Sequence, residues 1–161
     1  MCQDDAQRLI ENTLMNLAIF QPDIPQNTGA IIRNCACFNV DLDIIHPTSF
    51  VLSERSLNRV AMDYVNKLNI TEHNSWSDYK EKIDGRIILL STHGRVKHTS
   101  FKFNLDDNLL VGKESAGVPD YVHDEVDEII RIPMQKKTRS LNVSVASAIV
   151  MSEANRQLNL V

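Results

Sequence analysis

The chain has 161 residues, a formal net charge of −4 and a hydrophobic content of 43%. Its length is that of one domain, which buries about two-thirds of the surface that the unfolded chain exposes. The acidic charge argues against a protein that holds nucleic acid by bulk charge, so an RNA-binding surface must be a local basic patch. The candidates for this patch are residues 93–98 with Lys102 and residues 131–139. Each stretch alone is also compatible with a solvated loop.

The chain begins with a segment, residues 1–16, that mixes charged and polar residues. It lacks the basic start and the apolar middle of a secretion signal, and no apolar run in the chain approaches the roughly 20 residues that span a bilayer. We therefore expect an N-terminal extension over 1–16, one domain over 17–161, a cytoplasmic protein and no membrane partner.

Short apolar runs alternate with helical patterns from residue 16 onward. Strands are predicted at 16–21, 42–46, 66–71, 86–91, 108–111 and 128–132. The runs 86–91 and 108–111 are continuously apolar, which is typical of strands covered on both faces. Helices are predicted to begin at the capping residues Asn27 or Thr28, Ser53, Ser75 or Ser77, and Ser140 or Asn142. The chain is therefore predicted to be α/β, with a mostly parallel sheet and helices on both faces.

Two of these helices carry residue patterns that predict how they pack. The first is expected to pack through Ile31, Ile32, Cys35, Ala36 and Phe38, and Asn39 is a suitable left-handed residue for its end. The last and longest is predicted to run to Leu158, with the buried candidates Val145, Ala148, Ile149, Ser152 and Ala154.

Metal and phosphate-loop motifs are absent from the sequence. Cys35 and Cys37 lie two residues apart on a predicted helix, so their side chains diverge, and no second Cys or His pair has metal-ligand spacing. We interpret the cysteines as small apolar residues and expect no metal. Residues 112–115 (GKES) do not complete a phosphate loop, because Asp107 stands where that loop requires a glycine.

Polar clusters follow or precede the predicted elements at three places: residues 26–29 with Arg33, residues 112–117 and residues 139–142. Each alone has a simpler interpretation, namely a capped helix with a surface arginine, a structural turn and a helix N-cap. The carboxyl ends of parallel strands, however, are where open α/β folds bind ligands. Because Arg33 lies on an early helical turn, it is a plausible phosphate contact. We interpret the three clusters as one composite site.

Together these motifs resemble the SPOUT superfamily of knotted RNA methyltransferases, and within it the TrmH-type ribose 2′-O-methyltransferases. The matching segments are residues 22–29 (PDIPQNTG) continuing to Arg33, 59–64 (RVAMDY), 110–119 (LVGKESAGVP), 132–134 (IPM), 139–144 (RSLNVS) and 153–157 (EANRQ). They occur in the family's order, and the resemblance covers about residues 17–158. It is greatest for the small branch that modifies the wobble nucleotide of tRNA.

The resemblance implies a C-terminal deep trefoil knot, S-adenosylmethionine as the methyl donor and S-adenosylhomocysteine as the product. It implies an RNA partner, most specifically cytidine or uridine 34 in the anticodon loop of a tRNA, methylated on the ribose 2′-hydroxyl. It also implies a homodimer in which Arg33 of one subunit completes the pocket of the other.

Residue by residue, the resemblance implies cofactor contacts from Leu90, Gly112, Ile132, Met134, Ser140 and Leu141, with Ser91 and Thr92 as weaker candidates. It implies catalytic-site roles for Arg33, Asn27, Glu114, Ser140 and Asn142. Arg33 is expected to be a cation that grips phosphate and stabilises negative charge on oxygen, because a guanidinium stays protonated in proteins. Asn27 is expected to orient Arg33, Glu114 to hold the motif loops, and Ser140 and Asn142 to fix the ribose or the 112–117 loop.

Three alternatives remain open at this stage. The RNA could be ribosomal, although the lack of an appended RNA-binding domain favours a compact tRNA. The chain could be a non-catalytic RNA- or cofactor-binding module on the same scaffold, which the joint presence of the five catalytic-site residues disfavours. It could also be an unrelated doubly wound nucleotide binder, which the absence of a glycine-rich fingerprint disfavours.

Overall fold

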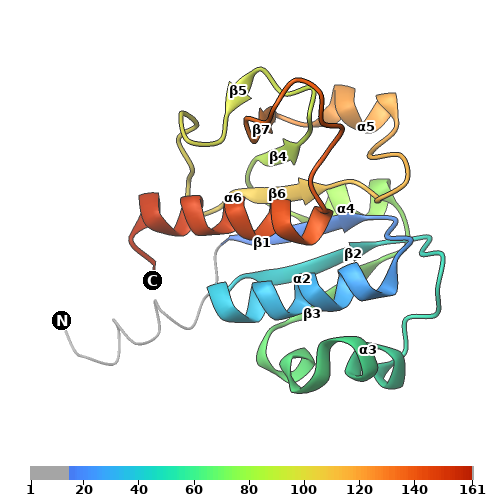
Figure 1. Ribbon diagram of the computed structural model, residues 1–161. Coiled ribbons are helices and arrows are strands. Elements are labelled where there is room, and N and C mark those ends of the chain that lie inside the picture. Colours follow the sequence, from blue (N-terminus) through green and yellow to red (C-terminus); the bar gives the residue numbers. More distant parts are fainter. Residues whose placement is uncertain (1–14, 161) are drawn as a thin grey trace.

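A computed structural model describes residues 15–160 of the protein. The predicted extension over residues 1–16 therefore lies outside the described residues except for Met15, which is buried, and Asn16, which begins the first strand. The described chain forms a seven-stranded sheet in the order β3-β2-β1-β6-β4-β7-β5, and every pairing between neighbouring strands is parallel (Figure 1).

The strands are β1 Asn16–Phe20, β2 Asp41–Ile45, β3 Ile70–His73, β4 Ile87–Leu90, β5 Val96–Lys97, β6 Asn108–Val111 and β7 Glu128–Arg131. The helices are α2 Pro25–Phe38, α3 Glu54–Ala61, the 3-10 helix η1 Met62–Lys67, α4 Trp76–Lys82, α5 Asp120–Glu125 and α6 Val143–Leu158. No helix within residues 15–160 combines the length and the apolar character needed to cross a bilayer.

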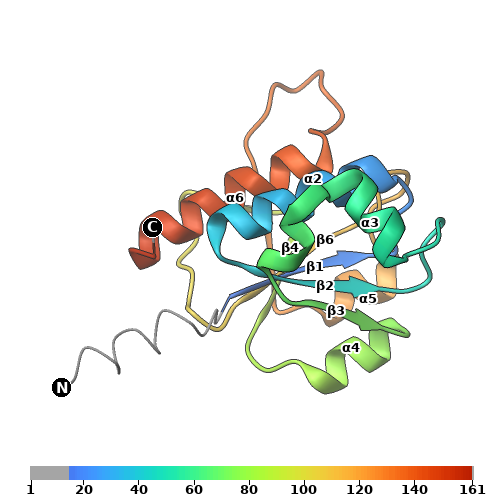
Figure 2. The same cartoon turned by 90° about the horizontal axis from the view of Figure 1, so that it is seen from below.

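Both faces of the sheet are covered by helices, as predicted, and each face has its own apolar cluster. Helices α2, α3 and α6 lie on one face, and α4 and α5 lie on the other (Figure 2). Side chains alternate along β1: Leu17 and Ile19 join the first cluster, while Ala18 and Phe20 join the second with Trp76 of α4. This alternation is the period of two that a strand imposes, and it explains why these strands are apolar throughout.

The start of α2 differs from the prediction. Neither Asn27 nor Thr28 caps it: Ile24 is the N-cap residue, and Pro25 occupies the first helical position. Proline is favoured there because its missing N–H would have no intrahelical partner. The predicted end at Asn39 is correct, since Asn39 adopts a φ of 53° and its N–H donates to the carbonyl of Cys35.

Other helix starts agree better with the sequence. Ser53 caps α3 through a reciprocal capping box with Ser56, Ser75 caps α4, and Asn142 caps α6. On α6, however, Val145 and Ser152 are exposed, so their predicted burial is wrong. The helix instead buries a polar-rich face that includes Ser147 and Asn155. Apolar periodicity was misleading there because these small polar side chains find backbone acceptors, as Ser147 does at Ser144.

The remaining differences concern short elements. The edge strand predicted at 66–71 forms at Ile70–His73, because residues 62–67 turn into η1 instead. The two-residue strand β5 and the six-residue helix α5 were not predicted, and both are too short to show a periodic pattern.

The order of the strands in the sheet brings together the loops that follow β4, β6 and β7. From β1 the chain builds outward through β2 to β3, then crosses to β4 on the other side of the sheet. The carboxyl ends of β4, β6 and β7 therefore lie side by side at one edge, next to the point where the direction of winding reverses. That point is where ligands bind in open parallel sheets.

Candidate functional site

A cavity of about 1100 Å³ lies at this edge of the sheet. The loops that follow β4, β6 and β7 form it together with the start of α6. All six residues predicted to contact a cofactor line it, and so do the two weaker candidates: Leu90, Ser91, Thr92, Gly112, Ile132, Met134, Ser140 and Leu141. Asn27, Glu114 and Asn142 of the predicted catalytic group also line it. Arg33 is not among its lining residues.

The loop after β6 is folded tightly on itself and forms one wall of the cavity. The N–H of Lys113 donates to the carbonyl of Gly117 at 3.1 Å, and the N–H of Gly117 donates back at 2.8 Å. A Cβ atom on Gly112 would lie 2.4 Å from the carbonyl carbon of Gly117, which leaves room for glycine alone. Glycine at position 112 therefore permits the tight closure of this loop on Gly117.

Glu114 connects this loop to the segment between β1 and α2. Its Oε2 accepts a hydrogen bond from the backbone N–H of Asp23 at 3.1 Å, and its own N–H donates to Asp23 Oδ1 at 3.1 Å. The hydroxyl of Ser115 donates to the other oxygen of Asp23. The two loops are thus joined reciprocally across 91 residues of sequence, which agrees with the expectation that Glu114 holds the motif loops.

The two carboxyl groups have opposite pKa shifts. The pKa of Asp23 is lowered, chiefly by its hydrogen bond with the Glu114 side chain and also by Ser115. The pKa of Glu114 is raised, first by burial and then by the neighbouring Asp23 carboxyl, while the amide of Asn27 opposes the rise. The two shifts have opposite signs because the neighbouring carboxyls do not ionise independently, and the two backbone hydrogen bonds hold the loops together.

A second connection joins the start of α2 to the start of α6. The side-chain N–H of Asn142 donates to Asn27 Oδ1 at 2.9 Å. The Oδ1 of Asn142 accepts from the backbone N–H of Ser144 at 2.9 Å, which caps α6. On the same pair of helices, the side chain of Asn34 donates to the carbonyl of Ser144 at 2.9 Å. Asn142 is therefore both the helix cap and the contact between two motifs.

Arg33 lies apart from these contacts. Its guanidinium carbon is 5.1 Å from the ring centroid of Tyr64 in η1, and its side chain is exposed. Within residues 15–160, Asn27 makes its side-chain hydrogen bond with Asn142 and makes none with Arg33. The expected orientation of Arg33 by Asn27 is therefore not a direct contact in this protomer.

The two basic stretches noted in the sequence meet beside the cavity. Lys97 of β5 is the register partner of Arg131 of β7, which directly precedes the lining residue Ile132. Arg139 lines the cavity, and Lys136 and Lys137 are exposed on the same loop. An acidic protein therefore has a local basic surface at the rim of its cavity, as RNA binding requires.

Several residues of the candidate site were not predicted from the sequence. Asp23 was quoted within a motif without a role, and its position just before a proline that begins a helix was the available signal. Asp120, His123 and Asp124 of α5 line the cavity, but an acidic run carries no periodic signal by itself. The contact between Tyr64 and Arg33 had no signal in the sequence, because it depends on how η1 packs against α2.

This cavity lies at the carboxyl edge of a parallel sheet, beside a glycine-bounded loop, which is where open α/β proteins bind their ligands. The chain matches the model of the SpoU rRNA Methylase family over residues 14–152, and it belongs to that family.

Relatives and solved structures agree with this assignment. A tRNA (cytidine(34)-2'-O)-methyltransferase of Beijerinckia indica is 44% identical over 145 residues, covering 88% of this chain and 91% of that protein. An Escherichia coli protein of the same name is 35% identical over 148 residues, covering 90% and 94%. A solved structure described as giving structural insights into the 2-OH methylation of C/U34 on tRNA is 34% identical, covers 90% of this chain and 96% of its own, and has a TM-score of 0.85.

Proposed function

We propose that this protein transfers a methyl group from S-adenosylmethionine to the ribose 2′-hydroxyl of nucleotide 34, cytidine or uridine, in tRNA. The observation that carries the proposal is the convergence of three motif loops on one cavity, through Asp23 with Glu114 and Asn27 with Asn142. The names of the relatives support tRNA over ribosomal RNA as the substrate.

The residues of the cavity fit this cofactor. Leu90, Val111, Ile132 and Met134 would supply apolar walls for an adenine ring, and the tightly closed 112–117 loop also lines the cavity. Asp120 and Asp124 supply negative charge for a ligand that carries a sulfonium and an amino group. S-adenosylmethionine supplies the electrophilic methyl group and leaves as S-adenosylhomocysteine.

The protein's part in the reaction is alignment and charge stabilisation. Methyl transfer to oxygen is an in-line displacement: the O–C bond forms, the C–S bond breaks with its electron pair staying on sulfur, and the hydroxyl proton passes to water. Arg33 would grip a phosphate next to the target ribose and stabilise the negative charge that develops on the 2′-oxygen. The paired Asn27 and Asn142, with Ser140 beside them, would fix the ribose against the cavity, where orientation contributes several kcal/mol to lowering the barrier.

The position of Arg33 supports a homodimer in which each cavity is completed by the partner. Its guanidinium is exposed and does not line the cavity of its own chain. Leu141 and Val145, at and near the start of α6, are 38% and 47% exposed, which is an apolar surface suited to a second copy of the chain. These two observations support an intersubunit site.

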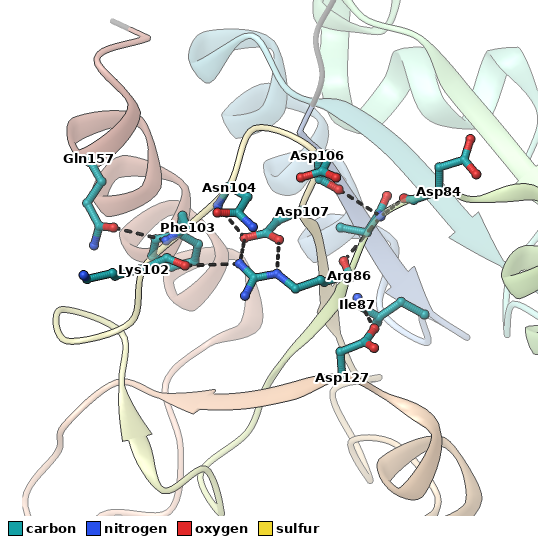
Figure 3. A network of polar contacts seen from close by, with 11 residues as sticks. Asp84, Arg86, Ile87, Lys102, Phe103, Asn104, Asp106, Asp107, Asp127 and Gln157 are labelled. Atoms are coloured by element: carbon teal, nitrogen blue, oxygen red, sulfur yellow. Dashed lines mark hydrogen bonds and ion pairs between the residues drawn. The ribbon is translucent and has the colours of Figure 1, made fainter.

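A trefoil knot is proposed for the C-terminal segment. Near the end of α6, Gln157 donates to the carbonyl of Phe101 at 2.9 Å and accepts from the N–H of Phe103 at 3.2 Å. The segment that carries these groups is anchored by the ion pair between Arg86 and Asp107 (Figure 3). These contacts support a loop closed around α6. Stretching the chain from its ends with optical tweezers should give an extension shorter than that of an unknotted chain of this length, and full extension would exclude the knot.

Arg33→Ala tests the proposed activity. The variant should bind S-adenosylmethionine with an unchanged dissociation constant in calorimetry, because Arg33 is outside the cavity, and should lose transfer of a radiolabelled methyl group to tRNA. Nucleoside mapping of the labelled tRNA should locate the product at position 34. Full turnover by Arg33→Ala, or label in ribosomal RNA alone, would contradict the proposal.

Mixing two inactive variants tests the shared site. Arg33→Ala keeps its cavity, and Ser140→Trp keeps Arg33 but fills part of the cavity that Ser140 lines. Random exchange between the two should restore about a quarter of the wild-type sites, since half of the twofold dimers then hold one complete site. No recovery in a mixture shown by sedimentation to contain dimers would exclude completion by the partner.

A further inference from the structure

Tyr64 contacts two cations at once. Its ring centroid lies 5.1 Å from the Cζ of Arg33 and 5.0 Å from the Nζ of Lys67. Tyr64 is half-buried and packs against the core cluster, whereas the side chains of Arg33 and Lys67 are exposed. Aromatic rings attract guanidinium and ammonium groups over their faces. A half-buried ring therefore restrains two exposed cations.

The packing of α2 against α3 and η1 sets this contact. A Cβ atom on Gly29 would lie 2.6 Å from the carbonyl oxygen of Val60, so only glycine permits the two segments to come this close. Arg33 follows Gly29 by four residues, and Tyr64 follows Val60 by four. Arg33 and Tyr64 therefore meet about one turn beyond the point where Gly29 and Val60 bring the two segments closest together.

The backbone before Tyr64 adopts an uncommon conformation that supports the same geometry. Met62, the first residue of η1, has a φ of 56° and a ψ of −138°, and its side chain is 63% exposed. Such a conformation is costly for a residue with a side chain and persists where surrounding structure imposes it. Here it ends α3 and redirects the chain so that Tyr64 turns back toward α2.

The charges around the ring leave Arg33 free to bind phosphate. Within residues 15–160, Arg33 makes no ion pair, and the pair between Lys67 and Asp63 is 3.5 Å long and exposed. The contact with the ring uses no carboxylate partner, so the N–H donors of the Arg33 guanidinium stay available for bidentate contact with a phosphate.

We propose that Tyr64 is a positioning residue for methyl transfer: its ring holds the Arg33 guanidinium, with Lys67 beside it, in the orientation that receives a phosphate of the RNA. This inference rests on the proposed function, since it concerns how Arg33 is held for the role assigned to it above. Without the ring, Arg33 remains present but samples many rotamers, and the aligned state becomes rare.

Tyr64→Leu, which keeps apolar packing but removes the ring, tests the inference. We expect kcat for tRNA methylation to fall about tenfold to a hundredfold, as for other small misplacements of a reacting group. The dissociation constant for S-adenosylmethionine should not change. Tyr64→Phe should restore kcat because the ring face is kept. Tyr121→Leu, which removes a half-exposed tyrosine that contacts neither cation, is the matched control and should behave as wild type.

The outcomes separate this inference from the proposed function. If Arg33→Ala is inactive while Tyr64→Leu has wild-type kcat, the positioning role is wrong and the proposed function stands. If Tyr64→Phe loses as much activity as Tyr64→Leu, the ring face is not the cause and the inference is again wrong. If Arg33→Ala is fully active, the proposed function itself fails. Should Tyr64→Leu lose cofactor binding through misfolding, Tyr64→Met replaces it under the same criteria.

Discussion

Replacing Asn142 with alanine removes three hydrogen bonds at the start of α6. The Oδ1 of Asn142 accepts from the backbone N–H of Ser144 at 2.9 Å and from its hydroxyl at 2.6 Å, and the side-chain N–H donates to Asn27 at 2.9 Å. The first contact caps the helix, and the last joins two motifs that line the cavity. The substitution therefore acts on stability and on the site together.

The expected loss of stability follows from these contacts. Loss of an Asn N-cap costs about 1 kcal/mol, and loss of a hydrogen bond such as that to Asn27 costs about 1 kcal/mol. The free energy of unfolding should fall by about 2 kcal/mol, which lowers Tm by roughly 4–8 °C in a domain of this size. Thermal and urea unfolding followed by circular dichroism measure both quantities.

Asn142→Asp separates the two roles. Aspartate caps helices as well as asparagine does, but it has no N–H to donate to Asn27. The aspartate variant should therefore keep about 1 kcal/mol more stability than the alanine variant, while both lose methyl transfer. Equal stability of the two variants would refute the capping argument. Full turnover by Asn142→Asp would refute the need for the contact with Asn27.

Two further predictions concern carboxylates. The stability that Glu114 contributes is complete below its ordinary pKa of 4.5 and is lost as the pH rises through its raised pKa. Glu114→Gln should therefore remove this part of the decline in unfolding free energy toward neutral pH, and an unchanged pH profile would exclude it. Asp107→Ala leaves the Arg86 guanidinium without its fully buried partner and should lower the unfolding free energy by about 3 kcal/mol in urea titrations. A loss below about 1 kcal/mol would show that the pair is not needed.

The continuous apolar runs at 86–91 and 108–111 correctly predicted buried parallel strands, because covering both faces of a strand demands apolar residues at every position. The caps Ser53, Ser75 and Asn142 were equally readable, since each satisfies backbone groups within one turn of its own helix. The family motifs predicted which loops line the cavity for a similar reason. Each motif is a run of neighbouring residues, so it can be read without knowing the tertiary structure.

Tertiary structure alone decided which of these local pieces meet. Asp23 pairs with Glu114 across 91 residues and Asn27 with Asn142 across 115, so neither contact has a local signal. Arg33 lies on Tyr64 because Gly29 lets α2 approach Val60 closely. Local hydrogen bonding and periodicity depend on neighbours in the chain, whereas strand order and helix packing depend on distant surfaces. The sequence by itself therefore determined the elements and their motifs, and the packed sheet determined the site.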